Sequence, residues 1–255
     1  MARMTYLEIV RDIMLDVTNG GVWVRTIDES IESTQITEIV KETFYRIIDS
    51  REWPHLYSLF QLTETSASTP THFTVPSNAV RIEYIKYDKR LSTDTRNKYL
   101  EVIYKTPLDF MNLLNARVSD ASNVTIITDT SGLPLNIYND KAPTYYTSFD
   151  NESVVMDAFD NTVETYLKTA KNQCYSKMYP TVTRTDTAVF DLPNEAFTYL
   201  LSEAKATASL SMKGIANLKA EQHSQSQKRR LSWEANNFKT NNSYYDAGRK
   251  SRKPL

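Results

Sequence analysis

The scarcity of glycine is the strongest restriction that this sequence places on its fold. Only five of the 255 residues are glycine. Nucleotide-binding folds need glycine where the backbone closely approaches a phosphate or turns with a positive φ. The chain contains no G-x-G-x-x-G, no G-x-x-x-x-G-K and no G-x-S-x-G. The sequence therefore argues against dinucleotide-binding enzymes, P-loop enzymes and α/β-hydrolases, and we expect no cofactor.

The rest of the composition favours a soluble binding or assembly protein without enzymatic activity. Its 40% hydrophobic and 24% charged residues are ordinary for a globular chain. A formal net charge of -1 gives the whole chain no attraction to nucleic acid or to an anionic membrane. One cysteine and three scattered histidines predict neither a disulfide nor a metal site. Neither a signal peptide nor a membrane span is expected.

Amphipathic helices are predicted at the start of the chain. Apolar residues recur at helical spacing over about residues 4–18, and Asn19-Gly20-Gly21 ends the run. A second helix is predicted from an N-cap at Ser33 or Thr34 to the residue before Pro54, because proline disfavours helical dihedrals in its predecessor.

A long helix is predicted near the end of the chain. It opens at Pro193 and carries one apolar stripe from Phe197 to Leu218. Gly214 is expected to be tolerated inside it. The helical pattern continues, with or without a break, to Phe238.

Sheet is predicted for the middle of the chain. Residues 56–191 form short alternating segments rich in Thr, Tyr, Val and Ile and punctuated by prolines. The charged segment 88–98 reads as an exposed hairpin loop, and residues 108–117 as one short helix. Residues 162–176 fit either helix or strand, and their alternation favours strand.

These patterns together predict an α+β fold in which N- and C-terminal helices form a bundle around an inserted, antiparallel β-rich platform. The bundle domain is assigned to residues 1–55 with 192–240, and the platform to residues 56–191. Residues 241–255 have no apolar periodicity and are assigned to a flexible C-terminal arm.

Two sets of residues could in principle carry catalysis. The acidic set Asp150, Glu152, Asp157 and Asp160 could bind calcium or act as a glycosidase carboxylate pair. Its spacing matches no calcium loop, and turn residues at Asp150 and Asp160, with Asp157 on the solvent side of a strand, are the simpler interpretation. Cys174 with His55 or His72 could form a nucleophile and base, but no local signature supports a thiol enzyme.

The near-zero net charge conceals a basic C-terminal end. From residue 228 onward the chain carries a net charge of +6, against -7 for the residues before it. A basic cluster on a helix is more often a solvated face than a phosphate site, and partner docking is the other interpretation. Aromatic and basic residues on an arm are enriched where a segment orders on a partner, while a solubilising end is the alternative. The candidate docking patch is Lys228, Arg229 and Arg230, and the candidate arm anchors are Tyr244, Tyr245, Arg249, Lys250, Arg252 and Lys253.

Several segments in order resemble the head-to-tail adaptor proteins of tailed bacteriophages, also called tail accessory or tail tubular proteins. After the N-terminal helix come Glu52-Trp53-Pro54, then Ala142-Pro-Thr-Tyr-Tyr-Thr-Ser-Phe-Asp150 and Val154-Val-Met-Asp-Ala-Phe-Asp160. Leu200-Leu-Ser-Glu-Ala-Lys-Ala-Thr-Ala208 then leads to the basic cluster. The resemblance covers most of the chain in short pieces.

The resemblance implies a structural virion protein of the phage neck, assembled in the host cytoplasm. It implies a dodecameric ring docked beneath the portal protein, with the C-terminal arm reaching onto portal subunits and tail nozzle, hub or fibre proteins attached below. A net acidic body suits a channel that DNA crosses with only transient, non-specific contacts. A surface- or glycan-binding β protein, a cell-wall glycosidase and a nucleic-acid-binding module remain alternatives.

Overall fold

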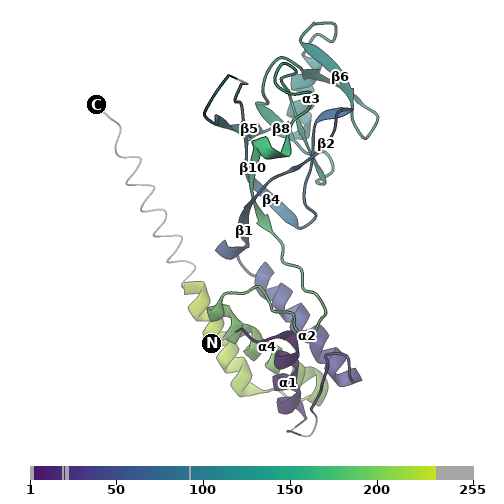
Figure 1. Cartoon of the computed structure of the whole chain (residues 1–255). Helices are drawn as coiled ribbons and strands as arrows, with labels where there is room; N and C mark the ends of the chain where they lie inside the picture. The colour runs from purple at the N-terminus through teal and green to yellow at the C-terminus, as the bar shows by residue number, and fades with distance from the viewer. Residues whose placement is uncertain (1–2, 19, 21–22, 92, 234–255) are drawn as a thin grey trace, which may run out of the picture. The chain divides into compact units, whose positions relative to one another are not determined.

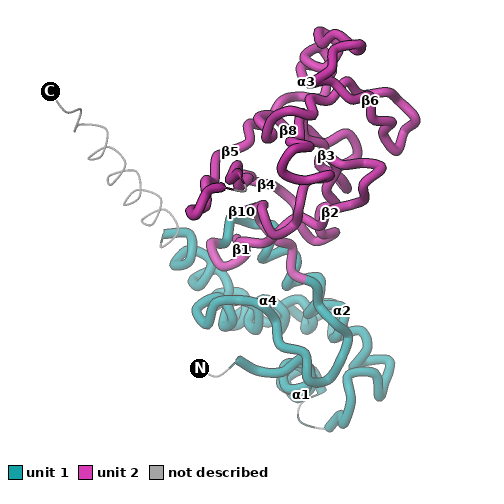
Figure 2. The backbone as a smooth tube through the Cα atoms, turned by 45° about the horizontal axis from the view of Figure 1, so that its top comes forward, with its two compact units in different colours: residues 1–53, 181–255 teal, residues 54–180 magenta. Residues whose placement is uncertain are grey.

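The computed structural model shows an α+β protein (Figure 1). The chain divides into two compact units, residues 1–53 with 181–255 and residues 54–180 (Figure 2). The described residues are 3–18, 20, 23–91 and 93–233.

Helices α1 and α2 of the first unit each begin after an N-cap residue, a threonine and a serine respectively. Helix α1 spans Tyr6–Val17, and Thr5 and Glu8 form a capping box at its start, which agrees with the predicted helix. Helix α2 spans Ile31–Asp49. Its N-cap is Ser30, three residues before the predicted one, because Ser30 accepts from the Ser33 backbone and Ser33 bonds back.

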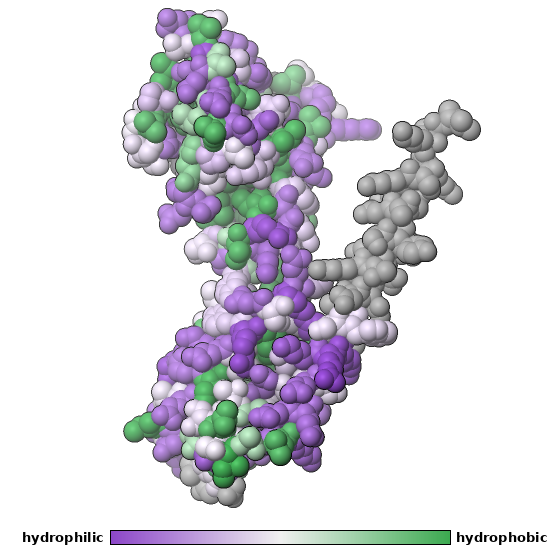
Figure 3. Space-filling model, turned by 180° about the vertical axis from the view of Figure 1, so that it is seen from behind, coloured by the Kyte–Doolittle hydropathy of each residue, from purple (hydrophilic) through white to green (hydrophobic). Residues whose placement is uncertain are grey.

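Helix α4 spans Asn194–Lys213, and the prediction that Gly214 lies inside a longer helix is wrong. Gly214 adopts φ 65°, the left-handed conformation that commonly ends a helix. A further helix covers residues 218–233. Ile215 and Leu218, assigned to the stripe of one continuous helix, are consequently exposed. Figure 3 shows hydrophilic side chains over much of this face of the first unit, with hydrophobic ones among them.

The core of the first unit lies where α1, α2 and α4 contact one another in pairs (Figure 1). Phe190 packs in this core, with its ring centroid 4.8 Å from that of Tyr6 and 5.1 Å from that of Phe44. The Tyr6 backbone also donates to the Ala188 carbonyl at 2.8 Å. Residues 181–191, which sequence patterns assigned to the platform, therefore belong to the first unit.

The second unit is built on one curled, mixed sheet of eight strands in the order β1-β10-β4-β5-β8-β9-β3-β2. A separate hairpin pairs β6 with β7. The strands are β1 Tyr57–Phe60, β2 Thr63–Ser66, β3 Thr69–Thr74, β4 Ala79–Asp88, β5 Tyr99–Tyr104, β6 Val124–Thr128, β7 Pro134–Tyr138, β8 Tyr145–Thr147, β9 Ser153–Met156 and β10 Asn172–Met178. Short 3-10 turns cover Pro54–Leu56 and Thr169–Lys171.

The sheet corrects two sequence predictions and agrees with a third. Strands β5 and β8 pair in parallel, so the platform is not purely antiparallel. Residues 162–176 are strand only from Asn172 onward, because Thr169–Lys171 forms a 3-10 turn before it. The loop 88–98 does connect an antiparallel pair, β4 and β5.

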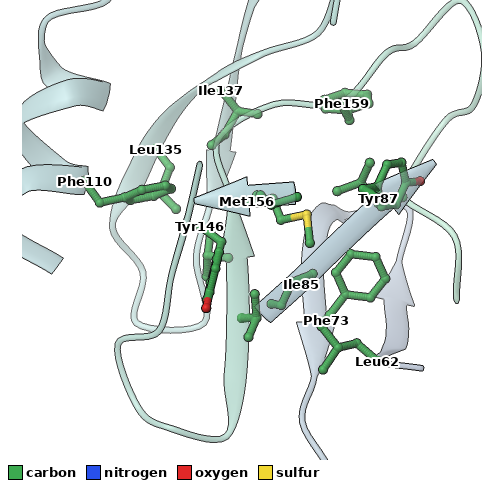
Figure 4. Packing of buried hydrophobic residues seen from close by; sticks show 14 of the residues in the cluster. Leu62, Phe73, Ile85, Tyr87, Phe110, Leu135, Ile137, Tyr146, Met156 and Phe159 are labelled. Carbon is green, nitrogen blue, oxygen red and sulfur yellow. The ribbon is translucent and has the colours of Figure 1, made fainter. Parts of the chain in front are cut away.

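The second unit has its own apolar core (Figure 4). Helix α3, Pro107–Asn115, is capped by Thr106 and buries Phe110 and Leu114 in this core. In Figure 4 Phe110 packs beside Leu135 of β7. The core thereby ties the helix and the β6–β7 hairpin to the main sheet.

Candidate docking surface

The predicted patch Lys228, Arg229 and Arg230 lies on the helix over residues 218–233, and all three residues are exposed. Trp233 is also exposed, at 67%. Residues three and four positions apart share a helix face, so Trp233 lies on the face of Arg230 and Arg229. The patch thus combines cations with an aromatic side chain, which sequence reasoning missed although the spacing showed it.

Polar contacts hold this helix against α4. The Ser224 hydroxyl donates to the Glu203 carboxylate, and the Ser202 Oγ and His223 Nδ1 atoms lie 2.8 Å apart. Leu231 is the buried apolar contact near the end of the helix. The helix is therefore held against α4 by its inner face, and Lys228, Arg229 and Arg230 are exposed on it.

A further cation from α2 joins the basic patch. Arg46 and Lys228 both line a groove of about 460 Å³ between α2, α4 and the 218–233 helix. The Nη2 atom of Arg46 is 2.9 Å from the Glu203 Oε1 atom. Glu203 thus positions both Arg46 and the helix. The surface thus brings the cations Arg46 and Lys228 together around one groove.

The predicted arm anchors lie outside the described residues. Tyr244, Tyr245, Arg249, Lys250, Arg252 and Lys253 all fall within the range 234–255. Residues 218–233 lead directly into that range, so the patch and the arm are consecutive in the chain.

Asp150 and Asp160 are turn residues, as the simpler interpretation held. Asp150 accepts from the backbone of Glu152 and Ser153 at 3.0 and 2.8 Å. Asp160 accepts from the backbone and hydroxyl of Thr162. Their oxygens are used to fix loops.

The expectation that Asp157 faces solvent is wrong. Its Oδ2 atom is 2.9 Å from the Nη2 atom of Arg117, and both side chains are almost fully buried. Its Oδ1 atom accepts from the backbone of Thr144 and Tyr145, each at 2.8 Å. Burial lowers the pKa of Arg117, and the Asp157 charge opposes that shift. Asp157 is therefore a structural ion-pair partner.

The candidate nucleophile Cys174 is buried, and the candidate base His72 contacts a carboxylate. Cys174 is buried, and burial raises its pKa to about 12, so its thiol stays protonated and is no nucleophile at neutral pH. The His72 Nε2 atom lies 2.9 Å from the Asp129 Oδ1 atom. His55 lies in the 3-10 turn Pro54–Leu56.

The Asp129 carboxylate should contribute acid-sensitive stability. Burial raises its pKa, but hydrogen bonds from Ser131 and His72 outweigh burial and hold the pKa at about 2, below the ordinary 3.8. A depressed folded-state pKa gives stability that is complete above about pH 4 and lost as the pH falls through about 2. The shift corresponds to about 2 kcal/mol at neutral pH.

We expect Asp129→Asn to lower the free energy of unfolding by about that amount at neutral pH and to weaken its acid dependence. Urea unfolding over a pH series measures both effects. Asp120→Asn, at an exposed carboxylate, is the control. Equal acid slopes for Asp129→Asn and the unchanged protein would contradict the assignment.

The described residues contain neither a candidate metal site nor a candidate membrane-spanning helix. No group of three or more His, Cys, Asp or Glu side chains there could hold a metal ion. No helix in the same part of the chain is both long and apolar enough to cross a bilayer. Comparison with family models and with curated proteins gives no match to this sequence.

Proposed function

We propose that this chain is a head-to-tail adaptor of a tailed bacteriophage. In this proposal a ring of copies, twelve as in the family it resembles, docks beneath the portal protein, extends the DNA channel and offers the attachment site for tail components. The chain acts there as a structural virion protein without turnover. Bundle helices, an inserted platform and a C-terminal arm are the arrangement that this function needs.

The exposed patch of Lys228, Arg229, Arg230 and Trp233 carries the proposal. Aromatic side chains and arginine are the residue types that most often dominate binding energy at protein interfaces. The chain continues from this patch into the segment with the arm anchors. Many copies acting together raise the effective concentration of each weak contact, so a modest patch suffices for stable attachment.

Two observations bear on the glycosidase and the glycan-binding alternatives. A glycosidase pair of Asp150 with Asp157 is disfavoured because Asp157 is buried against Arg117. Exposed tyrosines could serve glycan stacking, but the Tyr175 ring is stacked between Tyr57 and Tyr84, at centroid distances of 5.8 and 5.5 Å. Both faces of the Tyr175 ring are thus covered by neighbouring tyrosines and cannot stack on a sugar ring.

Truncation after Thr240 tests the arm. Melting of the truncated protein should stay nearly unchanged, because the removed residues have no core-facing periodicity. Binding to the portal protein of the same phage, measured by pull-down and by electron microscopy of the complex, should fail. Tight portal binding by the truncated protein would show that the docking surface lies elsewhere.

Substitution of the anchors separates packing from charge. Tyr244→Ala with Tyr245→Ala should weaken binding at every salt concentration. Neutralising Arg249, Lys250, Arg252 and Lys253 should weaken it mainly at low salt, where exposed charges are least screened. Replacing Lys86, Arg96, Lys105 and Lys177 of the second unit by Gln is the matched control, because it also removes four positive charges, and binding should survive it.

A further inference from the structure

An apolar groove of about 540 Å³ opens on the second unit between the start of α3, the β6–β7 turn and residues 149–150. Leu108, Leu133 and Phe149 line it and are 71%, 58% and 40% exposed. Large apolar side chains left open in one concave site are typical of a surface that binds a partner.

Two carboxylates complete the lining, the exposed Asp150 and the Asp129 side chain, which is 8% exposed and lies against His72. Hydrogen bonds from Ser131 and from Ser153 outweigh the effect of burial and lower the pKa of Asp129 and Asp150 respectively. Both groups are therefore ionised at neutral pH. The groove favours an apolar side chain accompanied by a cation over a purely apolar one.

The first unit presents a side chain of that kind. Trp23 is 63% exposed, and the Arg11 guanidinium lies 4.7 Å from its ring. Arg25 follows two residues later and is exposed. The Nε atom of Arg11 donates to the Val24 carbonyl at 2.7 Å, so the residue after Trp23 is anchored to α1. Tryptophan and arginine are enriched among the residues that dominate binding energy at protein interfaces.

We propose that Trp23 of one copy of this chain inserts into the groove of a second copy. Arg11 and Arg25 then lie opposite the carboxylates Asp129 and Asp150. The inference rests on the proposed ring and names a surface that joins neighbouring subunits. The contact uses two different surfaces of each copy, and such heterologous contacts generate rings when the rotation closes.

Cross-linking between two preparations tests the contact on the full chain. One preparation carries Thr26→Cys and the other Thr130→Cys, exposed positions beside Trp23 and at the groove that leave Trp23 and Leu133 in place. A short bis-maleimide joins thiols that lie close together. The native Cys174 is buried and does not compete. We expect a cross-linked dimer when the preparations are mixed and none from either alone. The control pairs are Trp233→Cys with Thr130→Cys and Thr26→Cys with Leu100→Cys, in which one exposed site of each pair lies outside the contact.

Trp23→Ala gives a second readout. It should weaken self-association by about ten-fold or more in sedimentation velocity, as an interface anchor does. Its melting should be unchanged because the side chain is exposed.

Two outcomes overturn the contact: absence of the mixed cross-link up to millimolar protein, or efficient intramolecular cross-linking when both substitutions are placed on one dilute chain. Portal binding is measured separately. Portal binding without the cross-link would refute this contact alone, and the cross-link without portal binding would refute the adaptor function alone.

Discussion

Replacing Ile47 with aspartate should unfold the helical unit and leave the β-rich unit folded. Ile47 is 1% exposed on α2, in the core that α2 forms with α1 and α4. An unpaired carboxylate there costs several kcal/mol, against a total stability of about 5–15 kcal/mol for a typical protein. The second unit keeps its own core, so the loss should be confined to the helices.

Circular dichroism and calorimetry measure this result. We expect loss of helical signal at a temperature where the β-rich unit still shows its own transition. Ile31→Asp is the matched control, because Ile31 is 77% exposed in the first turn of the same helix, where a negative charge is favourable. Melting of Ile47→Asp like that of Ile31→Asp would show that the assigned core is wrong.

Local patterns predicted the helices of this fold better than their ends. The apolar stripes of α1 and α2 follow directly from residue spacing, and their buried residues match it. The end of α4 was missed because an isolated glycine fits both a tolerated interior position and a left-handed cap. Gly214 takes the second role, and Ile215 and Leu218 just beyond it are exposed.

Contacts between distant residues could not be predicted from the sequence. The parallel pairing of β5 with β8 skips two strands and a helix, so no local signal specifies it. Arg117 and Asp157 are 40 positions apart, and an aspartate near a turn is usually exposed. Burial of Asp157 becomes visible only when α3 and β8 are brought together.

Part of the candidate docking surface could likewise be predicted from the sequence, and part of it depends on packing. Three consecutive basic residues and a tryptophan on one helix can be found from spacing alone. The placement of Arg46 beside Lys228 depends on how α2 packs against α4, and the role of Glu203 depends on both. Charge patterning thus identifies the binding face, while packing decides which further residues join it.

Breaking the buried ion pair should destabilise the second unit strongly. Arg117 donates to the Asp157 carboxylate at 2.9 Å and also to the carbonyls of Asp157 and Asn136. It therefore joins the end of α3 to β7 and to the residues after β9. Arg117→Met leaves a buried, uncompensated carboxylate, and we expect a loss of about 3–5 kcal/mol in the free energy of unfolding, measured with urea.

A second substitution separates charge from shape. Adding Asp157→Asn to Arg117→Met removes the uncompensated charge but keeps an acceptor for the backbone of Thr144 and Tyr145, so part of the stability should return. Arg81→Met is the control, because its pair with Glu83 is largely exposed and should be worth less than about 1 kcal/mol. Equal losses for Arg117→Met and Arg81→Met, or simple additivity in the double variant, would show that the pair does not stabilise the unit in this way.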